Sequence, residues 1–102
     1  MHVSKFEDIC RQSGLTAVAR EKIDGYDVYI ADGVKKPCKD HPQEHFRTLY
    51  AVGRGEELEL ARPLIFDKHL ISNQRQEHRI NSAIKDASET VQSLNRVRNN
   101  EQ

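Results

Sequence analysis

The sequence predicts an α+β fold, with a short N-terminal helix, a small antiparallel sheet of two hairpins and a long C-terminal amphipathic helix. Three observations support this class. All five glycines lie at or before Gly55, and no glycine or proline follows Pro63. Two segments of the front half show period-two alternation around turn residues, which is typical of β-hairpins. From Ile80 onward apolar residues recur at helical spacing, which is typical of an amphipathic helix.

Length and charge favour a single domain without a nucleic-acid or membrane partner. The 102 residues fit the common domain size of about 100 to 150 residues. We expect an α+β front domain over 1–66 and a C-terminal helical segment over 67–102 that frays at 99–102. The 16 basic and 16 acidic residues give zero net charge, whereas binding to a nucleic-acid backbone needs clustered Lys and Arg. The longest apolar run, 64–66, is far too short to span a membrane.

The N-terminal segment carries the signature of a short helix. Ser4 and Glu7 match the S-x-x-E capping box, in which each side chain satisfies a backbone N–H of the first helical turn. Gly14 stands where a left-handed C-terminal cap forms most easily, so the helix is expected to end near Ser13. One face of this helix is apolar and consists of Phe6, Ile9 and Cys10.

The first hairpin is predicted over residues 16–31, with its turn at Asp24-Gly25. An Asp-Gly pair favours a two-residue turn because both residues tolerate positive φ. The core face then pairs Ile23 with Tyr26, Glu21 with Val28 and Ala19 with Ile30, and the other face pairs Lys22 with Asp27 and Arg20 with Tyr29. Glu21 must lie at an edge or find a partner, since an unpaired buried carboxylate is costly. Asp32-Gly33 is expected to end the second strand.

A second hairpin is predicted after an intervening loop. Residues 47–52 have a strand pattern, Gly53-Arg54-Gly55 supplies a turn, and residues 57–60 alternate acidic and apolar side chains. A short helix over residues 56–61 is the alternative, because Glu, Leu and Ala are good helix formers. Pro63 is expected to end either version.

The tail divides into three parts. Residues 64–71 contain a dense apolar cluster that should dock on the front domain, and residues 72–79 are polar throughout. The third part carries a heptad-like apolar seam. The seam consists of Ile80, Ile84, Ala87, Val91 and Leu94 and is widened by Ala83 and Val97.

The polar stretch decides what the seam contacts. A continuous helix from Asp67 to Arg98 would be about 48 Å long. It would overhang a front domain whose radius of gyration is about 11 Å. A break near Asn73 would instead let the seam fold back across the sheet. Intramolecular packing is the usual fate of such a stripe in a small domain, and binding to a partner is the alternative.

The loop over residues 34–45 contains a cluster with metal-binding chemistry. Cys38, His41 and His45 have C-x2-H-x3-H spacing, and Cys10 could complete a Cys2His2 zinc site. In a zinc finger, however, about a dozen residues separate the cysteine pair from the histidine pair. We therefore expect a solvated loop without a metal or another cofactor. Because no signal-peptide pattern precedes the cysteines, we expect free thiols in a reducing cytoplasm.

No catalytic motif is present in the sequence. It lacks a Gly-rich phosphate loop, a nucleophile elbow and a paired-carboxylate motif, and it indicates no small-molecule substrate. The sequence therefore predicts a small non-enzymatic protein-interaction module, a regulator or stoichiometric inhibitor that binds a larger protein or forms a homodimer. The predicted partner-binding residues are Ile80, Ile84, Ala87, Val91 and Leu94, with Arg75 and Arg79. The alternative is a zinc-stabilised nucleic-acid-binding domain that uses Cys38, His41 and His45.

Overall fold

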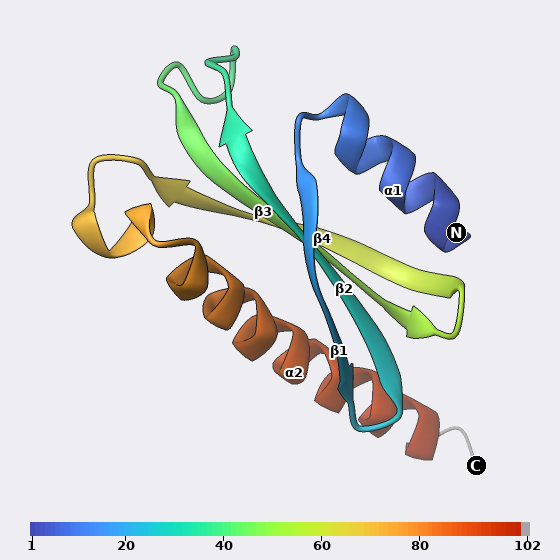
Figure 1. The fold of residues 1–102 in the computed structure, drawn as a ribbon. Coiled ribbons are helices and arrows are strands. Elements are labelled where there is room, and N and C mark those ends of the chain that lie inside the picture. Colours follow the sequence, from blue (N-terminus) through green and yellow to red (C-terminus); the bar gives the residue numbers. More distant parts are fainter. Residues whose placement is uncertain (101–102) are drawn as a thin grey trace.

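The computed structural model describes residues 1–100 of the chain. Its elements are α1 (Val3–Gln12), β1 (Thr16–Ile23), β2 (Tyr26–Lys35), β3 (His45–Arg54), β4 (Glu57–Asp67), the 3-10 helix η1 (Ile71–Gln74) and α2 (Gln76–Asn100). The predicted α+β class is confirmed (Figure 1). Of the end that was expected to fray, residues 99 and 100 are helical, and 101–102 lie outside the described residues. None of the described helices is long and apolar enough to cross a membrane.

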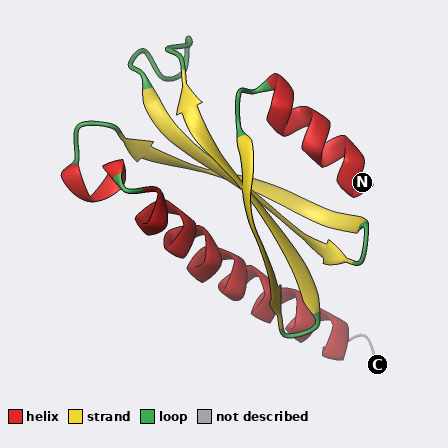
Figure 2. Ribbon diagram, in the orientation of Figure 1, coloured by secondary structure: helices red, strands yellow, loops and turns green. Residues whose placement is uncertain are grey.

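The four strands form one antiparallel sheet in the order β1-β2-β3-β4, and the two helices lie on opposite sides of it (Figure 2). Successive side chains of a strand point to opposite faces. On one face α2 packs against a core that includes Val28 and Val52, and on the other α1 packs against Ala31 and Ala51. The central strands β2 and β3 are therefore covered on both faces.

The predicted register of the first hairpin is confirmed, since all five expected residue pairs are observed. The turn residues Asp24 and Gly25 have φ values of 47° and 89°, as an Asp-Gly turn requires. The expected core face is also confirmed, because Tyr26, Val28 and Ile30 are at most 1% exposed and lie in the cluster under α2. Glu21 is exposed, because β1 is an outer strand.

Strand β2 does not end at Asp32-Gly33, as the sequence suggested, but continues to Lys35. Asp32 is 3% exposed and is held by an internal ion pair instead of a turn. Gly33 is required for close packing, because a Cβ there would lie 2.7 Å from the carbonyl oxygen of Gly14. The missing side chain lets the connection from α1 to β1 pass directly over β2.

The second hairpin is confirmed as a pair of strands, and the alternative helix over residues 56–61 is not formed. Strand β4 continues through Pro63 to Asp67, so the expectation that Pro63 ends it is wrong. Proline is tolerated in an outer strand because one side of the strand has no neighbour that needs its N–H. Residues 64–66 therefore belong to the sheet itself, so the predicted apolar cluster over residues 64–71 is divided between β4 and the segment that follows it.

Helix α1 starts two residues earlier than the capping-box prediction places it. Its N-cap is His2, whose Nδ1 atom accepts the N–H of Ser4. The first residues are held by the start of β4 and the turn before it, since His2 forms a β-bridge with Glu57 and the Val3 N–H donates to the Glu56 carbonyl at 2.8 Å. At the other end Gly14 has φ 76°, as expected of a C-terminal cap. Of the predicted apolar face, Phe6 and Cys10 are buried, whereas Ile9 is 39% exposed.

The polar stretch over residues 72–79 does not form one helix. The continuous helix from Asp67 to Arg98 is therefore wrong, and the break near Asn73 is confirmed. η1 ends at Gln74, Arg75 is extended with ψ 120°, and α2 begins at Gln76. The chain thereby reverses, and α2 runs back along one face of the sheet (Figure 1).

We expect the packing of α2 to be essential for folding. Val91→Asp places an unpaired carboxylate at a position that is 0% exposed and should lower the free energy of unfolding by about 3–5 kcal/mol. Val97→Asp is a matched control on the same helix, where the native side chain is 57% exposed, and should change it by less than about 0.5 kcal/mol. Urea denaturation followed by circular dichroism measures both. Equal effects of the two substitutions would show that α2 does not dock as described.

Candidate interaction surface

The predicted partner-binding seam lies mostly inside the protein. Ala87 and Val91 are 0% exposed. Ile80, Ile84 and Leu94 are half-buried and pack against the cluster on the sheet. The seam therefore packs within the protein, as expected of such a stripe in a small domain, and a partner could reach only the edges of its half-buried members.

The buried stripe of α2 is rotated from the predicted seam. Its centre consists of the side chains that are at most 4% exposed, namely Arg79, Ala83, Ala87 and Val91. These residues follow one another at intervals of four, so they share one side of the helix. The two alanines let the helix backbone approach the sheet closely. Arg79 was predicted to contact a partner, and the structure corrects this prediction because its side chain is fully enclosed.

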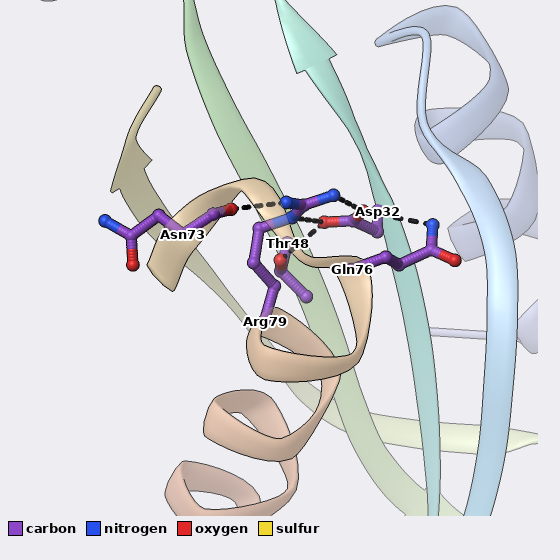
Figure 3. A network of polar contacts seen from close by, with 5 residues as sticks. All are labelled: Asp32, Thr48, Asn73, Gln76 and Arg79. Carbon is purple, nitrogen blue, oxygen red and sulfur yellow. Dashed lines mark hydrogen bonds and ion pairs between the residues drawn. The ribbon is translucent and has the colours of Figure 1, made fainter. Parts of the chain in front are cut away.

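Arg79 makes a buried ion pair with Asp32 of β2 (Figure 3). The Nε atom of Arg79 donates to Oδ1 of Asp32 at 2.9 Å and its Nη2 atom donates to Oδ2 at 2.7 Å. Nη1 donates to the carbonyl oxygen of Asn73. The guanidinium carbon lies 3.9 Å from the ring centre of Phe46, which adds a cation–π contact. The arginine is thus engaged by its own chain on several sides.

The Asp32 carboxylate receives further hydrogen bonds. Thr48 donates to Oδ1 at 2.8 Å and Gln76 donates to Oδ2 at 3.2 Å. Burial by itself raises the pKa of Asp32, but the hydrogen bonds from Arg79, Thr48 and Gln76 outweigh burial and hold this pKa below its ordinary value. Because both charges are satisfied within the protein, this network serves to attach α2 to the sheet and does not form an open reactive site.

The segment over residues 67–75, called the corner here, is pinned by hydrogen bonds. The Asp67 carboxylate accepts the His69 N–H at 2.8 Å, and the Asp67 carbonyl accepts from the Leu70 N–H and the Asn73 side chain, both at 3.3 Å. The Asn73 N–H donates to the Leu70 carbonyl at 3.0 Å, and Asn73 is 9% exposed. The corner therefore has a fixed backbone, which the buried arginine also holds through the Asn73 carbonyl.

The corner displays two adjacent aliphatic side chains to solvent. Leu70 is 54% exposed and Ile71 is 80% exposed. The sequence prediction missed this feature by placing both residues in a docking cluster with 64–66. Recognising residues 57–67 as one strand would have revealed it, because Leu70 and Ile71 then follow the strand and precede the helix. Arg75, which was predicted to contact a partner, is exposed at the end of the corner.

Both outer strands resist pairing with another chain. β4 contains Pro63, which cannot donate to a new neighbour. β1 has a bulge between Ala17 and Ala19. Antiparallel pairing of two β1 edges about Glu21 would set this residue opposite itself and Arg20 opposite Lys22 of the second copy, and like charges directly opposite are destabilising. Partner binding by strand addition is therefore disfavoured.

The two cysteines and the two loop histidines are not gathered into one four-ligand site within residues 1–100. Cys10 is buried and Cys38 is exposed, and both are free thiols. Burial, together with the nearby Glu7 carboxylate, raises the pKa of the Cys10 thiol, which makes it a poor nucleophile and ligand. Within residues 1–100, no group of three His, Cys, Asp or Glu side chains is arranged to hold a metal ion. The Cys2His2 arrangement considered from the sequence is therefore not formed.

In comparisons with known proteins, no family model, no curated protein and no solved structure matches this chain. The surface of the protein displays a preorganised apolar protrusion at the corner, while the seam of α2 packs against the sheet.

The ion pair leads to a prediction for acid stability. The pKa of Asp32 is lower in the folded protein than its ordinary value, so its contribution to stability is present above about pH 4 and is lost as pH falls through the folded pKa. The unfolding free energy of Asp32→Asn should therefore approach that of the wild type as pH is lowered from 7 to about 3. Urea titrations at each pH measure this difference, with Glu89→Gln as an exposed control. A difference that stays constant over this range would contradict the assignment.

Proposed function

We propose that the protein is a small non-enzymatic interaction module, a regulator or stoichiometric inhibitor that binds a larger protein through its corner. The main observation in support of this proposal is that the side chain of Ile71 is 80% exposed. It lies next to the exposed Leu70, on a turn that hydrogen bonds hold in place. An isolated exposed aliphatic residue is ordinary. Two neighbouring ones on a rigid protrusion have the form of an anchor that inserts into a partner's pocket.

The energetics favour such an anchor. Transferring an exposed Leu or Ile side chain from water to an apolar pocket is worth about 1.5–3 kcal/mol. Because the Asp67 and Asn73 hydrogen bonds already order the turn, little conformational entropy remains to be lost on binding. Preorganisation of this kind lets a small contact area contribute usefully to affinity.

Polar side chains surround the two exposed apolar residues of the corner. Arg75 follows η1 and is exposed, and His69 lies exposed on the other side of Leu70 and Ile71. Lys68 is already paired with Glu44, and this pair holds the pKa of Glu44 below its ordinary value. Exposed rim charges of this kind influence the rate and specificity of association more than its strength.

The double substitution Leu70→Asp with Ile71→Asp tests this function. Both native side chains are exposed, so the variant should keep the wild-type unfolding free energy within about 1 kcal/mol. It should weaken binding by at least about a hundredfold, since each lost anchor is worth about tenfold or more. Partners retained by the immobilised wild type from an extract of the source cells would be purified and titrated by calorimetry, and self-association would be measured by light scattering.

Val97→Asp is the matched control, since it adds a carboxylate at an exposed valine near the other end of α2. It should leave both binding and oligomeric state unchanged. The proposal fails if the double variant binds as tightly as the wild type. It also fails if the wild type retains no protein that the double variant loses, whatever its oligomeric state.

A further inference from the structure

His45 has the environment of a metal ligand. His45 is the first residue of β3 and is only 5% exposed. Its Nδ1 atom lies 3.2 Å from the carbonyl oxygen of Gln43, to which it can donate a hydrogen bond. Its Nε2 atom is buried and has no hydrogen-bond partner within the described chain. A histidine that binds a metal through one nitrogen commonly donates the other N–H to a backbone carbonyl.

A second imidazole lies at a suitable separation. The ring centres of His41 and His45 are 5.0 Å apart, and the two rings are inclined by 51°. Two imidazoles that share one tetrahedral ion at metal–nitrogen distances of about 2.1 Å place their ring centres about 5 Å apart. The separation of the two ring centres is therefore one that a shared ion would allow.

The two histidines line a common cavity of about 290 Å³ on the surface, together with Glu44, Asp67 and Lys68. The Lys68 ammonium is neutralised by Glu44. Across the sheet His45 is flanked by Lys35 on β2 and by Asp67 on β4. Each of these two lysines is thus matched by a carboxylate, Lys68 by Glu44 and Lys35 by Asp67.

We propose that His41 and His45 form a two-histidine site for a borderline divalent metal ion such as Zn²⁺, with water in the remaining positions. Neutral imidazole is the preferred protein ligand of such ions. The site has two protein donors, because within residues 1–100 no third His, Cys, Asp or Glu side chain completes it. It is therefore weaker than a closed structural zinc site, and it does not use Cys38, unlike the loop considered from the sequence. The cavity borders the corner at Asp67 and Lys68, but the two proposed ligands lie outside the corner and do not include Leu70 or Ile71.

Calorimetric titration of the metal-free chain with ZnCl₂ at pH 7.5 tests this site, and Co²⁺ absorption reports the ligand set. One ion should bind per chain. His41→Ala should weaken binding at least tenfold, because it removes one of two protein donors while altering only a loop residue. His45→Gln should do the same, and its thermal unfolding would be recorded because His45 is buried.

Three controls make the result decisive. Cys38→Ser, His69→Ala and His78→Ala remove other potential ligands and should leave the Zn²⁺ affinity within about twofold of the wild type. The proposal is overturned if the wild type shows no saturable binding, if His41→Ala binds normally, or if Cys38→Ser abolishes binding. If His45→Gln fails to fold, the His41→Ala titration alone decides.

Discussion

The ion pair between Asp32 and Arg79 is the interaction that holds the start of α2, and the corner before it, against the sheet. It joins the middle of the sheet to the first turns of α2, and both residues are at most 4% exposed. Burying two charges is favourable only when the geometry is good and the remaining polar atoms are satisfied. Here the contact is bidentate, and Thr48, Gln76 and the Asn73 carbonyl satisfy further atoms (Figure 3). A buried arginine without this partner would be strongly destabilising.

The same ion pair links the core to the proposed binding surface. Through the Asn73 carbonyl, Arg79 fixes the turn that precedes α2, and this turn displays Leu70 and Ile71. The chain reverses at this point, so the apolar stripe of α2 faces the sheet and the anchor faces solvent. The protein therefore buries the apolar seam of α2 and still presents the apolar Leu70 and Ile71 to solvent. Polar residues of the corner, Asp67 and Asn73, hold the turn that displays them.

Local signals predicted the fold well where the chemistry is local. Asp24-Gly25 determined the register of the first hairpin, and the apolar period identified α2. Long-range contacts were not predictable. Asp32 has the sequence pattern of a turn residue, and only its contact with the distant Arg79 explains why it lies within a strand. Pro63 has the pattern of a strand end, and it is tolerated within β4 because β4 is an outer strand. For the site, Arg75 is exposed and its predicted contact with a partner stays a prediction, whereas the exposure of Ile71 depends on where β4 ends.

A double-mutant cycle on Asp32 and Arg79 tests the central claim most directly. Unfolding free energies would be measured for the wild type, Asp32→Asn, Arg79→Met and the double variant. If the pair joins α2 to the sheet as described, removing either partner leaves the other buried and unpaired, so the two losses overlap and the coupling energy should be about 2–3 kcal/mol. Losses that add to within about 0.5 kcal/mol would contradict the account, because they would show that the two residues stabilise the fold independently.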